Sequence, residues 1–160
     1  TLRNLKMGHT ITLNEYDCNA GVLHINGSTN ISISNCIFYG CGSMGITSYN
    51  SSSLKMDNSV IEKCNLRIMS LYESEDFTFT NCKFRETRHL DMFNLFYAKN
   101  ITFDNCEIRD NTSDYGSLFE LSSSANIKVM NTKMINNKAD SVGNGLILTG
   151  ITFQGNSFDK

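Results

Sequence analysis

Two aspartates stand at equivalent places in a repeated pattern and could form a catalytic carboxylate pair. Asp57 ends the segment Leu54-Lys-Met-Asp, and Asp104 ends the similar segment Ile101-Thr-Phe-Asp. If both segments are strands of one sheet with a further copy between them, the two carboxylates project from the same face, about 9 to 10 Å apart. Inverting glycosidases hold their two carboxyl groups about 6.5 to 9.5 Å apart. The spacing makes Asp57 and Asp104 candidates for glycoside hydrolysis, and the alternative is that both are solvated surface residues.

A second set of candidates lies where the length of the repeat varies, in residues 87–92, 111–116 and 137–144. Loops on one edge of a stack of repeats commonly form its binding surface. A histidine beside acids can also transfer a proton or hold a cation. These segments predict a binding edge, and the alternative is that they are solvated turns. The candidate residues are Arg88, His89, Asp91, Asp114, Tyr115 and Asp140.

The elements that must position these residues come from one gapless repeat. Each copy alternates apolar and polar residues, passes an asparagine, and then alternates again, which is the period-2 pattern of two strands around a sharp turn. Asparagine suits such a turn because it tolerates the left-handed backbone conformation. Five copies start at Ile31, Leu54, Phe77, Ile101 and Ile127, and their turn asparagines are Asn35, Asn58, Asn81, Asn105 and Asn131.

A third short strand precedes each copy by eight residues, in segments that start at Leu23, Ile46, Met69, Phe93 and Phe119. Three strands in about 23 residues leave connections too short for a crossover helix. Each strand must therefore pair with its equivalent in the next repeat. The pattern predicts an all-β fold, a parallel β-helix (solenoid) with three strands per rung and about six to seven rungs.

The two ends of the chain hold weaker copies. We align Ile151-Thr-Phe153 with the first strand of a further copy, and Leu5-Lys-Met7 with the start of an earlier one.

With its asparagine column and its stacked apolar columns, the sequence resembles the pectin-lyase-like right-handed β-helix proteins over residues 5–158. The resemblance implies right-handed coiling. It implies little about activity, because that superfamily includes polysaccharide lyases, hydrolases, epimerases, phage tailspikes, adhesins and non-catalytic repeats. Its hydrolases would show Gly-His-Gly and paired-Asp motifs, and its lyases a calcium-binding acidic cluster with an arginine. Here Gly8-His9 is an isolated dipeptide.

The six cysteines fit the repeat better than they fit a disulfide framework or a zinc site. Cys36, Cys82 and Cys106 share one position with Ser59 and Thr132, whereas Cys18, Cys41 and Cys64 share another with Thr87, Asn111 and Asn137. Cysteines stacked in register have nearly parallel Cβ vectors, which fits disulfide geometry poorly. No Cys-x2-Cys pair is present. We therefore predict buried free thiols and no metal or cofactor.

Composition and charge exclude several partners. A net charge of −2 and a pI near 5.9 give no electrostatic footprint for nucleic acid. No apolar run reaches the roughly 18 to 20 residues that a membrane span needs. The chain starts at Thr1 without a methionine, so we expect residues 1–160 to form a single β-helix domain of a longer protein.

Two functional hypotheses remain. The first is a non-catalytic β-helix segment of a surface or secreted protein, extracellular or at the cell surface, that serves as a rigid scaffold or binds carbohydrate or protein. The alternative is a carbohydrate-active enzyme, either a polysaccharide lyase or a glycoside hydrolase. Because no amphipathic helix caps either end, we also expect end-to-end self-association.

Overall fold

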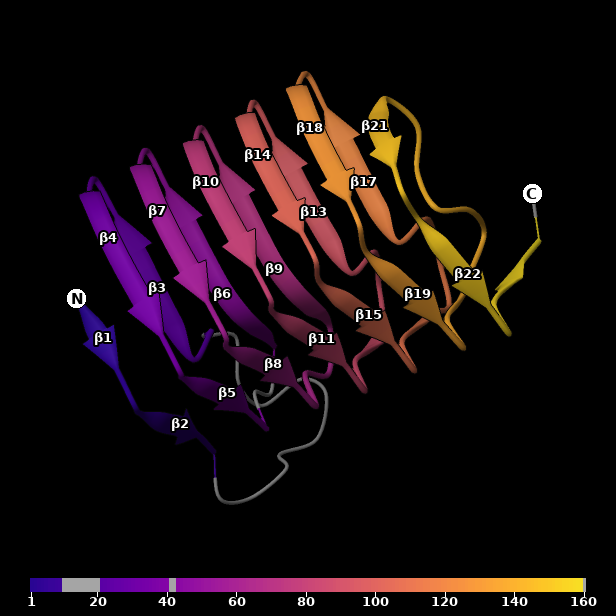
Figure 1. Cartoon of the computed structure of the whole chain (residues 1–160), viewed down its shortest axis with the longest axis horizontal. Helices are drawn as coiled ribbons and strands as arrows, with labels where there is room; N and C mark the ends of the chain where they lie inside the picture. The colour runs from indigo at the N-terminus through magenta and orange to yellow at the C-terminus, as the bar shows by residue number, and fades with distance from the viewer. Residues whose placement is uncertain (10–20, 41–42, 160) are drawn as a thin grey trace.

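The chain forms a stack of short parallel strands (Figure 1). The computed structural model describes residues 1–9, 21–40 and 43–159. In this part of the chain there is no helix, and hence none long and apolar enough to cross a membrane. Each strand pairs with its equivalent in the neighbouring rung, so the sheets run along the stack and confirm the predicted parallel β-solenoid.

The two longest sheets, which we call sheets A and B, hold the first and second strands of the repeat. Sheet A contains, in order, β1 (Leu2–Arg3), β4 (Thr29–Ser34), β7 (Ser52–Asp57), β10 (Glu75–Thr80), β14 (Lys99–Asp104), β18 (Ala125–Met130) and β21 (Leu146–Thr149). Sheet B contains β2 (Lys6–Gly8), β5 (Ile37–Tyr39), β8 (Val60–Glu62), β11 (Lys83–Arg85), β15 (Glu107–Arg109), β19 (Lys133–Ile135) and β22 (Thr152–Gln154).

The other two sheets are shorter. Sheet C holds the predicted third strands, namely β3 (Leu23–Asn26), β6 (Met44–Tyr49), β9 (Arg67–Tyr72), β13 (Phe93–Phe96) and β17 (Phe119–Ser122). Sheet D holds β12 (Arg88–His89), β16 (Thr112–Ser113), β20 (Lys138–Ala139) and β23 (Ser157–Phe158).

Sheet D lies at the corner for which the sequence predicted only variable loops. Its strands are two residues long, too short to show alternation in the sequence. Backbone hydrogen bonds hold them in the stack, such as Thr112 N–H to the Thr87 carbonyl and Lys138 N–H to the Asn111 carbonyl, both 2.9 Å. Several rungs thus carry a short fourth strand besides the three that were predicted.

The register confirms the predicted core columns. Phe77 pairs with Ile101 in sheet A, and Phe84 lies between Ile61 and Ile108 in sheet B. One column of sheet C consists of Leu23, Ile46, Met69, Phe93 and Phe119.

Aromatic rings fill the middle of the core. Phe79 stacks on Phe103 with ring centroids 4.8 Å apart, and Phe93 stacks on Phe119 at 4.3 Å. Phe84 meets Phe103 edge to face at 5.8 Å, so the rings of sheets A, B and C interlock. All five side chains are buried, and such pairs stabilise a core beyond the apolar area that they bury.

The turn asparagines adopt the predicted left-handed conformation. All five have φ between 47° and 54°: Asn35, Asn58, Asn81, Asn105 and Asn131. Two of them also contact each other along the stack, as Asn105 Nδ2 donates to Asn81 Oδ1 at 2.6 Å. The asparagine column therefore turns each rung, and at Asn81 and Asn105 it also links adjacent rungs.

The predicted register of the last copy is wrong. Phe153 pairs with Met134 in sheet B, whereas its predicted place was in sheet A. That place belongs to β21, in which Leu146 pairs with Ile127. In the described part of the chain, no strand follows β17 in sheet C, so the final rung reaches sheet A after fewer residues than the repeat implies. Phe153 is half exposed on this last rung. End-to-end association of the stack stays a prediction.

The predicted start of the first copy is also displaced. Leu2 pairs with Ile33 in sheet A, and Met7 pairs with Phe38 in sheet B. Leu5-Lys-Met7 thus runs into the second strand of its rung, because the first strand is reduced to two residues.

The cysteines divide into two chemical states. Cys36, Cys82 and Cys106 are free and buried, as predicted. Cys64 is disulfide-bonded, so the prediction of a free thiol is wrong there; Cys18 and Cys41 lie outside the described residues. Residues stacked in register have nearly parallel Cβ vectors, but the corner that holds Cys64 accommodates a disulfide.

Alkylation of the native protein tests this division. We expect iodoacetamide to leave Cys36, Cys82 and Cys106 unmodified until urea unfolds the chain, because the thiolate is the nucleophile and all three thiols are buried. A hydrogen bond with Cys106 and burial raise the pKa of Cys82, which opposes thiolate formation further. Cys64 should label only after reduction. Mass spectrometry of the labelled peptides reads both results, and equal labelling of Cys82 before and after urea would contradict them.

Candidate functional site

The structure places the predicted carboxylate pair as expected. Asp57 and Asp104 both align with Thr80, two rungs apart on sheet A. Each carboxylate accepts a hydrogen bond from an asparagine amide, Asp57 from Asn58 and Asp104 from Asn131, both at 2.9 Å. These contacts tie the two acids to the asparagine turns, and a catalytic role stays a prediction.

The structure brings together only part of the predicted binding edge. His89 Nδ1 lies 3.2 Å from an Asp114 carboxylate oxygen, so these two side chains form a pair across adjacent rungs. Tyr115 is 76% exposed beside them. Asp140 lies one rung further along, with its backbone N–H bonded to the Gly116 carbonyl at 2.9 Å.

Asp91 has a different environment from the other residues of that edge. The residue is 8% exposed, and its carboxylate receives two hydrogen bonds from the Arg67 guanidinium, at 2.9 and 3.0 Å. Arg67 belongs to β9 on the preceding rung, so this bidentate pair links two rungs where sheet C begins. The carboxylate of Asp91 is thus already occupied by a partner within the chain.

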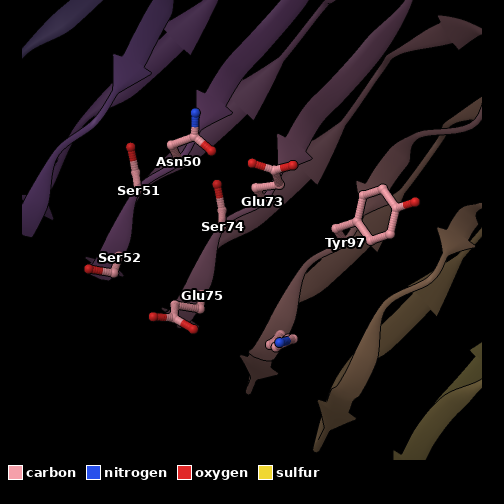
Figure 2. A pocket seen from close by; sticks show the side chains of 8 residues that line it. Asn50, Ser51, Ser52, Glu73, Ser74, Glu75 and Tyr97 are labelled. Carbon is pink, nitrogen blue, oxygen red and sulfur yellow. The ribbon is translucent and has the colours of Figure 1, made fainter.

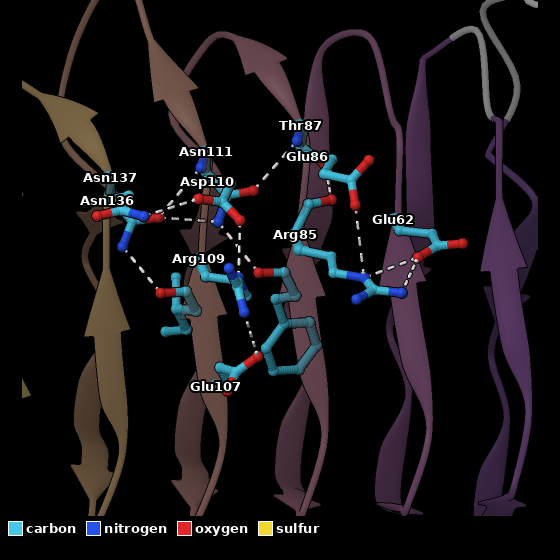
Figure 3. A network of polar contacts seen from close by, with 12 residues as sticks. Glu62, Arg85, Glu86, Thr87, Glu107, Arg109, Asp110, Asn111, Asn136 and Asn137 are labelled. Atoms are coloured by element: carbon cyan, nitrogen blue, oxygen red, sulfur yellow. Dashed lines mark hydrogen bonds and ion pairs between the residues drawn. The ribbon is translucent and has the colours of Figure 1, made fainter.

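A ladder of charges follows the end of sheet B (Figure 3). Arg85 contacts Glu62 at 2.7 Å and Glu86 at 3.7 Å, and Arg109 contacts Asp110 at 2.7 Å. The Arg109 hydrogen bond lowers the pKa of the Asp110 carboxyl. These charges satisfy one another, which is the arrangement expected of a structural network.

Buried amides line the same corner (Figure 3). Asn111 Nδ2 donates to Asn137 Oδ1 at 3.0 Å, and Asn137 Nδ2 donates to Asn156 Oδ1 at 2.9 Å. Asn111 Nδ2 also reaches the Phe84 carbonyl at 3.1 Å. These amides provide hydrogen-bond partners for polar groups that are buried away from water.

A hollow of about 700 Å³ lies outside this corner and includes Arg88 of the predicted edge. Two more of its charged residues, Lys63 and Glu86, approach each other to 3.9 Å, and a third, Asp110, is held by Arg109. Much of the charge around this hollow is therefore engaged within the protein, which leaves fewer groups for a ligand.

A column of aromatic side chains runs along the outer face of sheet C. Tyr49, Tyr72 and Phe96 are register partners on three consecutive rungs. Their ring centroids are 5.8 Å apart from Tyr49 to Tyr72 and 5.1 Å from Tyr72 to Phe96. We call these three residues the aromatic ladder. Because its rings face one another along the stack, the ladder serves as a support and offers little open ring face.

Tyr97 is different because it stands across the ladder. Its ring is nearly perpendicular to those of Tyr72 and Phe96, at interplanar angles of 82° and 83°, and it is 48% exposed. Its backbone φ is 52°, a left-handed conformation that is uncommon for a bulky residue. The repeat requires this conformation, because the equivalent corners are also left-handed; they are Gly27, Asn50, Glu73 and Ser123. Glycine and asparagine adopt it at lower cost than the other residues. Among these five corners, Tyr97 alone places an aromatic ring at the turn.

Tyr97 forms one side of a hollow of about 500 Å³ between sheets C and A (Figure 2). We call this hollow the corner site. Polar side chains from three rungs surround it. The lining residues are Asn50, Ser51, Ser52, Glu73, Ser74, Glu75, Tyr97 and Lys99.

The polar groups of the corner site fall into two kinds. The Ser51 hydroxyl donates to the Tyr49 carbonyl at 2.8 Å, and the Ser74 hydroxyl donates to the Tyr72 carbonyl at 3.1 Å, so these two residues hold the turn. No described residue forms an ion pair with Glu73 or Glu75, although both carboxylates are exposed.

The pKa of the Tyr72 phenol is affected by the negative charge of this corner. Burial and the adjacent Glu73 carboxylate raise the pKa of the Tyr72 phenol, because both disfavour a second negative charge there. Tyr72 therefore stays neutral and keeps its place beneath Tyr97 well above neutral pH.

Sequence reasoning missed the corner site. A signal was present, since Tyr49, Tyr72 and Phe96 all stand five residues before the first core residue of the next copy. Only the fold shows that these positions lie on the outer face of sheet C, close to the hollow lined by Glu73 and Glu75. Among the described residues there is no cluster of three or more His, Cys, Asp or Glu side chains that could hold a metal ion.

Comparison with known proteins supports the fold alone. A family model for the right-handed β-helix region matches residues 13–160. No curated protein matches the chain. Two solved structures of QnrB1, a plasmid-mediated fluoroquinolone resistance protein treated with trypsin, align at 14% identity over 82% of this chain and 91% and 89% of theirs, with TM-scores of 0.18.

Proposed function

Since the chain belongs to the right-handed β-helix family, we propose that it is a rigid scaffold that binds carbohydrate at the corner site. The observation that carries this proposal is Tyr97, a half-exposed aromatic ring held in a left-handed turn beside the exposed carboxylates of Glu73 and Glu75.

The chemistry of the corner site suits a sugar. A pyranose has an apolar face of C–H groups and a rim of hydroxyls. The exposed ring of Tyr97 can pack against the apolar C–H face. Asn50, Glu73 and Glu75 can form hydrogen bonds with the hydroxyls. Binding sites of this kind combine an apolar platform with a few placed polar groups.

The scaffold holds these groups in place before a ligand arrives. The Tyr97 N–H bonds to the Ser122 carbonyl at 2.9 Å, and the Tyr97 ring abuts Phe96 with centroids 4.5 Å apart. Little conformational entropy is then lost on binding, which favours affinity from a small contact area.

The experiment uses Tyr97→Asn, because Asn50 occupies the equivalent left-handed corner two rungs away. We expect the variant to bind its best glycan about tenfold more weakly, since the stacking surface is gone. Its urea midpoint should change little, because asparagine relieves the backbone strain while some ring packing is lost.

Glucan, mannan, chitin, chitosan and polygalacturonate oligosaccharides serve as probes, with affinity measured by calorimetry. Tyr115→Asn is the comparison variant, because it removes the exposed tyrosine of the predicted binding edge. It should leave affinity unchanged when the glycan binds at the corner site. A parallel assay for new reducing ends detects cleavage. The proposal fails if no probe binds, or if Tyr97→Asn and Tyr115→Asn bind alike.

This proposal also supports an extracellular or cell-surface location, where polysaccharides of this kind are met. Detection of the protein by antibody on intact cells of its source would test that location.

A further inference from the structure

The corner site has an unbalanced charge. Glu73 and Glu75 contribute two carboxylates to its lining, and Lys99 contributes one ammonium group. Glu75 and Lys99 are register partners on adjacent strands, yet they form no ion pair. The next residue, Asp76, adds a further exposed carboxylate, which accepts a hydrogen bond from Asn100 at 2.9 Å. The local field is therefore negative.

The two glutamates also flank one turn. Glu73 precedes and Glu75 follows the buried Ser74, whose hydroxyl contacts that of Ser48 at 3.0 Å. Since Ser74 fixes the turn from inside, both glutamate backbones are anchored while their carboxylates extend toward solvent (Figure 2). Tyr97 lines the same hollow, and the face of an aromatic ring carries partial negative charge.

We infer that the corner site selects glycans that carry free amino groups. This inference rests on the proposed carbohydrate-binding function and names its ligand class. A protonated amino sugar offers an ammonium group, which two carboxylates can bind by charge-assisted hydrogen bonds and an aromatic ring by a cation–π contact. An N-acetylated sugar of the same stereochemistry keeps the apolar face and loses the charge. A uronic acid meets like charge at Glu73 and Glu75.

The experiment compares three ligands of equal chain length, namely oligomers of glucosamine, N-acetylglucosamine and galacturonic acid. Calorimetry is run in mildly acidic buffer, in which the glucosamine amines are protonated. We expect the glucosamine oligomer to bind at least about fivefold more tightly than the N-acetylated one. This margin should shrink as salt is added, because the pairs are exposed.

Charge variants of the chain give a second test, because removing a carboxylate and removing the ammonium group should change glucosamine affinity in opposite directions. Glu73→Gln and Glu75→Gln should each weaken glucosamine binding and leave N-acetylglucosamine binding unchanged. Lys99→Gln should strengthen glucosamine binding, because it removes the repelling charge. Glu120→Gln is the matched control, since Glu120 is exposed on β17 outside the corner site.

The outcomes separate this inference from the proposed function. Equal affinity for the acetylated and free amino oligomers, with no effect of Glu73→Gln or Glu75→Gln, overturns the inference while the carbohydrate-binding function stands. Tighter binding of the galacturonate oligomer also overturns it. If none of the three ligands binds and the wider glycan panel is also negative, the proposed function itself is overturned.

Discussion

Phe103→Ala is expected to lower the free energy of unfolding by about 3 to 5 kcal/mol. Phe103 is fully buried on β14, and its ring contacts Phe79 at 4.8 Å, Phe93 at 5.2 Å and Phe119 at 5.4 Å between centroids. These partners come from three rungs and two sheets. Neighbouring rungs cannot close the cavity without giving up their own backbone pairing, so relaxation should be limited.

Urea denaturation followed by circular dichroism measures this effect. Phe153→Ala is the matched control, because Phe153 is 50% exposed on the last rung and its removal should cost less than about 1 kcal/mol. Comparable losses for the two variants would mean that the interlocked rings do not form the core. A stack of repeats can also lose rungs separately, so agreement between far-ultraviolet dichroism and tyrosine fluorescence should be checked for each variant.

Asp91→Ala is expected to destabilise the protein by roughly 2 to 3 kcal/mol. The substitution leaves the largely buried Arg67 guanidinium without the carboxylate that receives two of its hydrogen bonds. Removal of one partner from a buried pair costs about 3 to 5 kcal/mol, and partial exposure of Arg67 reduces that value here. Asp91 and Arg67 lie on consecutive rungs, so the loss should loosen the start of sheet C.

Asp114→Ala is the control for this second prediction. Asp114 is exposed and pairs with His89 at 3.2 Å, a contact for which we expect less than about 1 kcal/mol. A double-mutant cycle with Arg67→Met isolates the pair energy, because methionine keeps the apolar contacts of the arginine stem. If Asp91→Ala and Asp114→Ala have equal effects on the urea midpoint, Asp91 does not hold the rungs together.

Most of the fold could be predicted from the sequence, because in a stacked repeat the same contact recurs in each copy. Ile31, Leu54 and Phe77 occupy the same position, so one period-2 segment predicts the core column for its neighbours as well. The asparagine column could be predicted in the same way, since every copy needs the same left-handed turn.

Where a rung departs from the repeat, the predictions made from the sequence were wrong. Phe153 resembles a first-strand residue but lies in sheet B, because pairing with β19 satisfies its backbone in a rung that lacks a third strand. Cys64 resembles a corner residue that threonine or asparagine could replace, but it is disulfide-bonded. Both outcomes depend on the geometry of individual rungs, which composition and spacing do not encode.

The sequence by itself determined which residues face inward and which rung each belongs to, because burial follows the period of the strand. Only the tertiary structure decided which outward residues act together. Asp91, Asp114 and His89 looked like one edge, yet Asp91 turns to Arg67 while His89 meets Asp114. Tyr97, Glu73 and Glu75 looked unrelated, yet they line one hollow. Outward side chains from different rungs share no periodic signal, since nothing selects them for a common core, and their meeting depends on how the corners of successive rungs align.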